Sequence, residues 1–156
     1  MTALRIAALT ACLLLSGAGA FAQTKIGDAT MLSVTGTCGR LAVAERDLSR
    51  DCTTKLLNVT YPDGRVGFYF VLADGGMVAF SGMDGDNPTP DSDVVNLDKV
   101  IMSRKDTPDQ PDVLRVTGTC TFGNPVKGPM TIACDGTLVD GAGFSAAFTT
   151  DGKPPT

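Results

Sequence analysis

The residues best suited to bind a ligand lie in one acidic, proline-containing stretch in the middle of the chain. This stretch runs from Gly82 to Ser92, and carboxylate and amide oxygens recur along it and just after it. Such hard oxygen ligands are suited to Ca²⁺. The candidate binding residues are Asp84, Asp86, Asn87, Asp91 and Asp93. The candidate calcium ligands are Asp84, Asp86, Asp91 and Asp93, with Asp98 further along the chain.

The spacing of this acidic stretch does not match an EF-hand loop. Counted from Asp84, the fifth and sixth positions are Pro88 and Thr89, whereas the sixth position of that loop requires glycine. A solvated acidic loop that limits aggregation is therefore the simpler interpretation. We assign no metal and no cofactor from the sequence.

The chain lacks the side chains that most often act as catalytic bases. It contains no histidine, which is the usual general base near neutral pH. Paired carboxylates could still support hydrolysis, as they do in glycosidases. Most of the aspartates, however, lie in turns beside glycine or proline, where aspartate is favoured for backbone reasons. We expect a protein that is not an enzyme, and keep a carboxylate-based hydrolase as an alternative.

The first 22 residues have the pattern of a secretory signal peptide. Arg5 precedes an apolar run from Ile6 to Leu15, and small residues then lead to an Ala-x-Ala site that ends at Ala22. The run is too short to span a bilayer, which requires roughly 20 apolar residues. We predict cleavage after Ala22 and a single domain over residues 23–156 in the periplasm or outside the cell.

A lipidated amino terminus is the alternative to a cleaved leader. Leu9-Thr10-Ala11-Cys12 has the form of a bacterial lipoprotein box. Lipidation at Cys12 would shorten the apolar run and leave Leu13, Leu14 and Leu15 outside it, so we prefer cleavage after Ala22.

The charge of the chain argues against nucleic acid and anionic membranes as main partners. The formal net charge is −4, and both of these partners reward clustered Lys and Arg. We therefore expect no nucleic-acid partner and no membrane insertion after cleavage. The expected partner is an unidentified protein or small molecule.

Four cysteines remain after the predicted cleavage, and an even number in an exported chain indicates two disulfides. The chain has no Cys-x-x-Cys motif and no histidine, which argues against a zinc site and a thioredoxin-like redox site. These four cysteines are Cys38, Cys52, Cys120 and Cys134.

A short motif occurs twice and indicates an internal duplication. Val34-Thr35-Gly36-Thr37-Cys38 recurs as Val116-Thr117-Gly118-Thr119-Cys120, and each copy is followed fourteen positions later by another cysteine. We predict a first repeat over about residues 31–76, an insert with the acidic loop over 77–112, and a second repeat over 113–152.

Strand geometry predicts which cysteines pair. If Cys120 faces Cys134 across an antiparallel hairpin, the apolar residues of both strands share one face and the polar residues share the other. In the first repeat the apolar residues after Cys52 have the wrong parity, so either a bulge lies near Leu56 and Leu57 or the pairing is wrong. We predict Cys38–Cys52 and Cys120–Cys134, and the intervening segment from Leu41 to Arg50 could form one short helical turn.

The remaining pattern predicts an all-β fold of about eight short antiparallel strands, closed as a small barrel or packed as a two-sheet sandwich. Further strands are expected over about 30–38, 54–61, 66–72, 77–81 and 94–102, and a frayed tail over 153–156. Inward side chains are expected at Val66, Phe68, Phe70 and Leu72 and at Phe144, Ala146 and Phe148. Tyr69 then points outward and is a further candidate contact residue.

The function expected from these features is that of an exported module that binds a protein or a small ligand through strand faces and loops. The long acidic loop on a cross-linked scaffold favours this interpretation, because binding residues are often carried by loops on rigid frameworks. A structural protein of the cell envelope without a dedicated ligand is the second alternative, beside the hydrolase.

Overall fold

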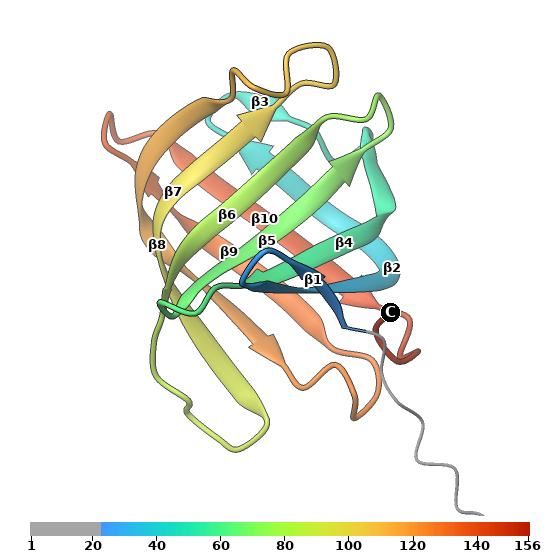
Figure 1. The fold of residues 1–156 in the computed structure, drawn as a ribbon. Coiled ribbons are helices and arrows are strands. Elements are labelled where there is room, and N and C mark those ends of the chain that lie inside the picture. The colour runs from blue at the N-terminus through green and yellow to red at the C-terminus, as the bar shows by residue number, and fades with distance from the viewer. Residues whose placement is uncertain (1–22) are drawn as a thin grey trace, which may run out of the picture.

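The computed structural model describes residues 23–156, so the predicted signal peptide and Cys12 lie outside the described residues. The described part contains ten β-strands and no helix (Figure 1). The strands are β1 (Thr24–Ile26), β2 (Ala29–Val43), β3 (Arg46–Asp47), β4 (Cys52–Thr60), β5 (Arg65–Leu72), β6 (Met77–Asp84), β7 (Ser92–Ser103), β8 (Asp112–Gly123), β9 (Thr131–Leu138) and β10 (Gly143–Thr150).

Eight of these strands form a closed antiparallel barrel. From β4 to β10 each strand pairs with the next one in the chain, and β2 closes the ring by pairing with both β10 and β4. Strands β1 and β3 are short additions that pair with β2. The all-β prediction is confirmed, and the architecture is the barrel rather than the sandwich.

Closure depends on the long strand β2, which changes neighbours along its length. Residues 30–35 pair with β4, and residues 36–43 pair with β10. Gly36 lies at the change of partner, where a Cβ atom would overlap the Thr149 carbonyl oxygen and approach the Phe148 ring to 2.9 Å. The first copy of the repeated motif therefore requires glycine for close strand packing.

Aliphatic and aromatic side chains fill the interior of the barrel. The Phe70 ring meets Phe80 and Phe148 edge to face, with ring centroids 5.5 and 6.2 Å apart. Both residue sets predicted to point inward are buried or packed against this core. An eight-stranded barrel is just wide enough for its side chains to fill it, so the interior is a packed core.

The second cross-linked pair consists of β8 and β9, and its predicted register is confirmed. Cys120 faces Cys134 and Val116 faces Leu138, as the alternation of apolar residues requires. The disulfide joins Cys120 to Cys134, and both residues are buried inside the barrel. Gly118 lies on the same hairpin, where a Cβ atom would overlap the Asp135 carbonyl oxygen.

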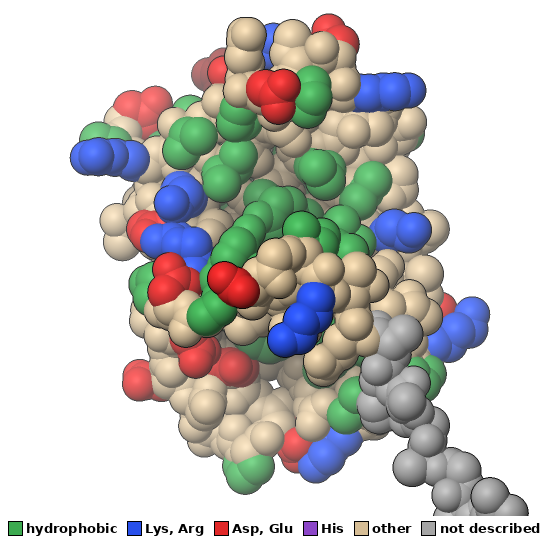
Figure 2. Space-filling model, viewed as in Figure 1, with side chains coloured by type: hydrophobic (Ala, Val, Ile, Leu, Met, Phe, Trp, Pro, Cys, Tyr) green, Lys and Arg blue, Asp and Glu red, His purple; other side chains and the backbone are tan. Residues whose placement is uncertain are grey.

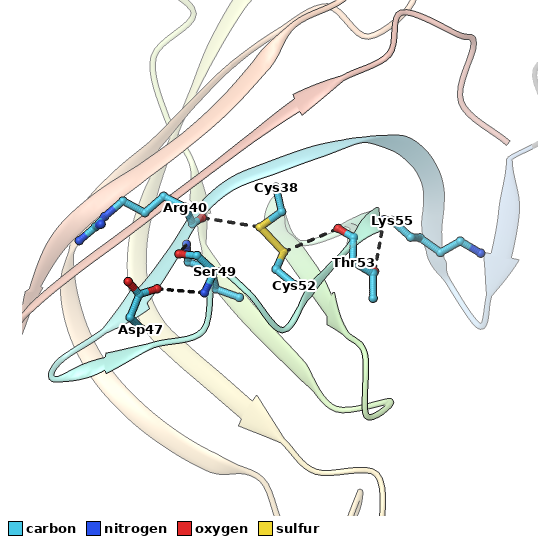
Figure 3. The surroundings of a disulfide bond; sticks show 8 residues. Cys38, Arg40, Asp47, Ser49, Cys52, Thr53 and Lys55 are labelled. Carbon is cyan, nitrogen blue, oxygen red and sulfur yellow. Dashed lines mark hydrogen bonds between the residues drawn. A yellow bond between two sulfur atoms is a disulfide. The ribbon is translucent and has the colours of Figure 1, made fainter.

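The first cross-linked pair consists of β2 and β4, and Cys38 is bonded to Cys52 as predicted (Figure 3). The register shift of β4 against β5 lies between Cys52 and Leu56, so it precedes the predicted bulge at Leu56 and Leu57. Leu56 consequently points inward and is fully buried. Leu57 faces Tyr69 in the β4–β5 ladder, which places it on the outer face.

The helical turn considered between Leu41 and Arg50 does not form. Strand β2 continues to Val43 because this segment pairs with β10, and β3 then turns back against its end. Ser49 fixes the turn: its backbone N–H donates to the Asp47 carboxylate at 3.0 Å, and its hydroxyl accepts from the Leu41 N–H at 2.9 Å (Figure 3).

The tail over 153–156 is ordered against β2 rather than frayed, which corrects the prediction from sequence. Ser33 and Thr156 exchange two backbone hydrogen bonds of 2.7 and 2.9 Å. Pro155 is buried. The tail docks here because β1 and β10 leave this part of the β2 edge unpaired, and the exposed backbone groups require partners.

Candidate functional site

Two loops at one end of the barrel enclose the candidate binding site. The β6–β7 loop (85–91) and the β8–β9 loop (124–130) extend from the lower end of the molecule in Figure 1. A cavity of about 230 Å³ opens between them. We call it the mouth cavity, and it is lined by Asn87, Thr89, Pro90, Asp91, Ser92, Asp93, Phe122, Gly123, Asn124 and Pro125.

Phe122 gives the mouth cavity an apolar wall. It lies at the end of β8, is half-buried, and packs edge to face on Phe68 with ring centroids 5.0 Å apart. The ring therefore joins the barrel core on one side and the cavity on the other. An aromatic surface beside a few polar groups is typical of small-molecule sites.

An ion pair connects the two loops. The Lys127 ammonium lies 2.7 Å from the Asp91 carboxylate, and it lowers the pKa of that carboxyl. Within the β6–β7 loop the hydroxyls of Thr89 and Ser92 are 2.7 Å apart. These contacts hold the walls of the cavity in place although neither loop has regular secondary structure.

Asp93 is the carboxyl group of the cavity whose pKa the fold raises. It faces Phe122 across the β7–β8 ladder, and partial burial raises its pKa. The nearby carboxyl of Asp84 acts in the same direction, while a 2.7 Å hydrogen bond from the Val94 N–H opposes the shift. A carboxyl group perturbed in a concave site is a candidate functional group.

The structure brings together only some of the residues proposed from sequence. Asn87, Asp91 and Asp93 line the mouth cavity, whereas Asp84 and Asp86 are not among its lining residues. Nothing in the sequence marks Phe122 as a wall of a site. Its alternation with Cys120 predicts a core residue, which describes only one side of its ring.

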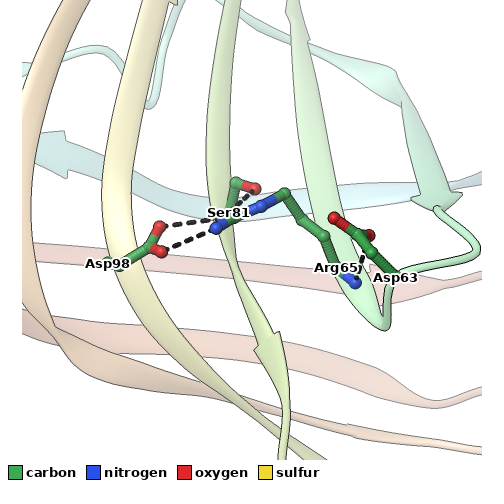
Figure 4. A network of polar contacts seen from close by, with 4 residues as sticks. All are labelled: Asp63, Arg65, Ser81 and Asp98. Carbon is green, nitrogen blue, oxygen red and sulfur yellow. Dashed lines mark hydrogen bonds and ion pairs between the residues drawn. The ribbon is translucent and has the colours of Figure 1, made fainter.

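The acidic residues are not arranged as a metal site. Within residues 23–156, no group of three or more Asp, Glu, Cys or His side chains is placed to hold a metal ion. Asp91 is paired with Lys127, and Asp98 receives two hydrogen bonds of 2.8 and 2.9 Å from Arg65 (Figure 4). The Arg65 guanidinium lowers the pKa of Asp98.

Four aspartates outside the cavity stabilise turns. In four of the Asp-Gly pairs the carboxylate accepts a hydrogen bond of 2.8 to 3.0 Å from the backbone N–H two residues later. Each forms an Asx-type turn, as aspartate commonly does. These residues are Asp63, Asp74, Asp140 and Asp151.

Tyr69 lies on the outer surface, away from the mouth cavity. Its ring covers Gly67, and its hydroxyl is 3.4 Å from that of Tyr61. Partial burial raises the pKa of Tyr69. Apolar side chains gather on this face over β4 to β7, in the middle of the view in Figure 2. Tyr69 therefore points outward, as its alternation with Phe68 and Phe70 predicts.

Residues 23–156 contain no free thiol. All four cysteines of residues 23–156 are in disulfides. The same residues contain no helix of the length and apolar character needed to cross a membrane.

Comparison with known proteins yields no relative from which a function could be transferred. No protein-family model, no curated protein and no solved structure matches this chain.

Proposed function

We propose that this protein is an exported, non-enzymatic binding module that takes a small ligand in the mouth cavity. The observation that carries the proposal is the cavity of about 230 Å³ with an aromatic wall, two ordered loops and a perturbed carboxyl group. Because the barrel interior is filled by its own side chains, the loops are the better location for a ligand.

Export is supported by the two disulfides, because such bonds persist in oxidising compartments. Together with the predicted leader, they favour the periplasm or the outside of the cell. A rigid, cross-linked barrel carrying irregular loops is well suited to present a binding site under such conditions.

The proposal is tested by filling the cavity and measuring ligand binding by NMR. Asn87→Trp places a large side chain at a lining residue that is exposed at the loop surface. Gln110→Trp is the matched control, because Gln110 is equally exposed in the 104–111 loop at the other end of the barrel. The probes are a library of small aromatic and aliphatic amines, alcohols and acids.

We expect hits that shift the backbone amides of residues 87–93 and 122–125 in the natural protein. The same hits should bind Gln110→Trp with unchanged affinity and fail to bind Asn87→Trp. Hits that bind both variants equally, or a library without any hit at these amides, would contradict the proposal.

One observation favours a carboxylate-based hydrolase as a second candidate: Asp84 lies close enough to Asp93 to raise its pKa. Two carboxyl groups that share a proton can act as acid and base. Fluorogenic peptide and glycoside substrates assayed in acidic and neutral buffer test this function. Turnover that Asp93→Asn abolishes would favour the hydrolase, and its absence would leave the binding module.

A further inference from the structure

A second hollow on the outer surface of the barrel combines exposed aliphatic side chains with positive charge. Two adjoining depressions of about 400 and 430 Å³ lie where the start of β8 passes the β9–β10 turn. Both are lined by Val113, Arg115 and Val139. We call this surface the β8 flank, and it is separate from the mouth cavity.

The aliphatic part of the β8 flank is unusually exposed. Val139 has 82% of its surface accessible to solvent and Val113 has 56%. Leu114 and Leu138 are half-buried and line the same depression. Single exposed aliphatic residues are ordinary, but two exposed valines beside two leucines that pack against the core form a contiguous patch of the kind that marks interaction sites.

The charged part consists of two cations on neighbouring strands. Lys99 of β7 lies directly opposite Arg115 of β8 in the ladder, and like charges in this position destabilise a sheet. In the part of the chain that the structure describes, neither side chain forms an ion pair with a carboxylate. The juxtaposition is notable because the whole chain is acidic, with a formal net charge of −4.

The two carboxylates that line these depressions accept hydrogen bonds from groups other than Lys99 and Arg115. Asp98 lines the depression, but both of its oxygens accept hydrogen bonds from Arg65. Asp140 lines the adjoining depression, and its carboxylate accepts a hydrogen bond from the Ala142 N–H at 3.0 Å. In Figure 2 the left side of the molecule, over β7 and β8, carries Lys and Arg side chains with Asp and Glu side chains between them.

We propose that the β8 flank docks a segment of a partner protein that carries a carboxylate next to a branched aliphatic side chain. The carboxylate binds between Lys99 and Arg115, where it neutralises two opposed cations. The aliphatic side chain packs between Val113 and Val139. Charge complementarity and the adjoining apolar hollow together define this ligand chemistry.

The lining of the apolar hollow favours a peptide segment over a long acyl chain. Its aliphatic lining consists of four side chains, which suffice for one branched side chain, and its remaining lining residues are the charged Arg115 and Asp140. A longer hydrocarbon would have to pass over charged groups or into solvent, which is unfavourable.

The test is an NMR titration of the exported protein with an end-blocked hexapeptide, Gly-Ser-Glu-Val-Leu-Gly. A second peptide with Gln in place of Glu removes the charge, and 4-methylpentanoate supplies the same chemistry as a free acid. The protein variants are Lys99→Gln and Arg115→Gln, with Lys55→Gln as a control that removes one exposed cation from β4.

We expect the Glu peptide to shift the amides of residues 99, 113, 115 and 139. Its affinity should fall about tenfold in Arg115→Gln and in Lys99→Gln, the scale of a charge-assisted hydrogen bond. The melting temperatures of both variants should be unchanged or higher, because each variant removes a like-charge contact. Asn87→Trp should bind the peptide normally, which separates this proposal from the mouth cavity.

Three outcomes would overturn the proposal. The first is equal affinity for the Glu and Gln peptides, and the second is an equal loss of affinity in Lys55→Gln. The third is 4-methylpentanoate binding to these amides as tightly as the peptide, which would assign the flank to a free acid.

Discussion

The two cross-linked strand pairs share a five-residue motif but differ in their surroundings. In each, fourteen positions separate the bonded cysteines. In the second pair, Cys120 and Cys134 are direct ladder partners and point into the core. In the first pair the β2–β4 ladder ends at Thr35 and Lys55, and the disulfide lies half-exposed beyond it.

The comparison separates two contributions of a disulfide to stability. Loop closure depends on the number of residues enclosed, so both bonds should contribute a similar entropic term. Packing depends on burial: the second disulfide is fully buried in the core, whereas Cys38 and Cys52 are only half-buried against its edge. The same sequence spacing can therefore yield two cross-links of unequal energetic value.

Removal of the buried cross-link should have the largest effect. Replacing Cys120 and Cys134 by alanine removes loop closure worth about 3 kcal/mol and leaves a void in the core. We expect urea titration to show a loss of about 4 kcal/mol or more in the free energy of unfolding. The matched variant, with alanine at Cys38 and Cys52, should lose only the loop term of about 3 kcal/mol. Equal losses would show that burial of the sulfurs adds nothing.

The next largest effect should come from replacing the glycine of the repeated motif. Gly36 and Gly118 allow neighbouring strands to pack closely in the two pairs. A methyl group in Gly118→Ala would overlap the Asp135 carbonyl oxygen and approach the Phe144 ring to 2.8 Å. We expect a loss of about 1–3 kcal/mol, as for other overpacked sites, and a similar loss in Gly36→Ala. Thermal unfolding measures both. In the control Gly39→Ala the nearest atom is 3.8 Å away, and a comparable loss there would remove the steric explanation.

A smaller effect concerns one aspartate near each cross-linked pair. The two aspartates, Asp93 and Asp47, should change the stability of the protein with pH in opposite directions. Burial raises the pKa of Asp93 above 3.8, so the folded state binds its proton more tightly than the unfolded state. Stability is therefore lost as the pH rises through the window above 3.8. Asp93→Asn should raise the melting temperature at neutral pH, with the gain vanishing well below pH 3.8.

Asp47, at the turn beside the first pair, should change stability with pH in the opposite direction. Hydrogen bonds from Ser49 lower the pKa of Asp47, so its contribution is present above pH 3.8 and lost as the pH falls through the folded value. Asp47→Asn should therefore lower the melting temperature at neutral pH. Melting curves that shift in the same direction for both variants would contradict this assignment.

The smallest expected difference is kinetic and concerns the order of reduction. Thiol–disulfide exchange requires access to a sulfur atom, and Cys38 and Cys52 are less buried than Cys120 and Cys134. With a mild reductant under native conditions, alkylation and mass spectrometry should detect free Cys38 and Cys52 first. Simultaneous release of all four thiols would indicate that global unfolding, and not access, controls the reaction.

The two strand pairs differ in how well their register could be predicted from the sequence. In the second pair, apolar residues alternate on one face from Val116 to Leu138, so one register satisfied the whole hairpin. In the first pair, Leu57 and Tyr61 are apolar but lie on the outer face near Tyr69. Alternation cannot distinguish an outer apolar cluster from a core, which is why Leu57 and Tyr61 have the wrong parity for a core face.

The features that sequence could not predict depend on contacts between distant segments. Barrel closure requires β2 to pair with β10, and no local pattern distinguishes this from two packed sheets. The mouth cavity likewise requires two loops, 85–91 and 124–130, that come together only when β7 pairs with β8. The acidic loop supplied Asn87, Asp91 and Asp93 as candidates, while Phe122 and Asn124 come from a hairpin that looked purely structural.

The pairing of β2 with β10 also has a consequence for folding. The first barrel strand to be synthesised, β2, can complete its pairing only after the last one, β10, has been synthesised. Val43 pairs with Phe144, and Gly36 pairs with Thr150. Topologies dominated by such distant contacts fold slowly, and the unclosed sheet exposes its edges meanwhile. Each disulfide, by contrast, joins residues only fourteen positions apart and can form before the ring closes. Disulfides that form before closure thus reduce the number of chain conformations from which β2 and β10 must pair.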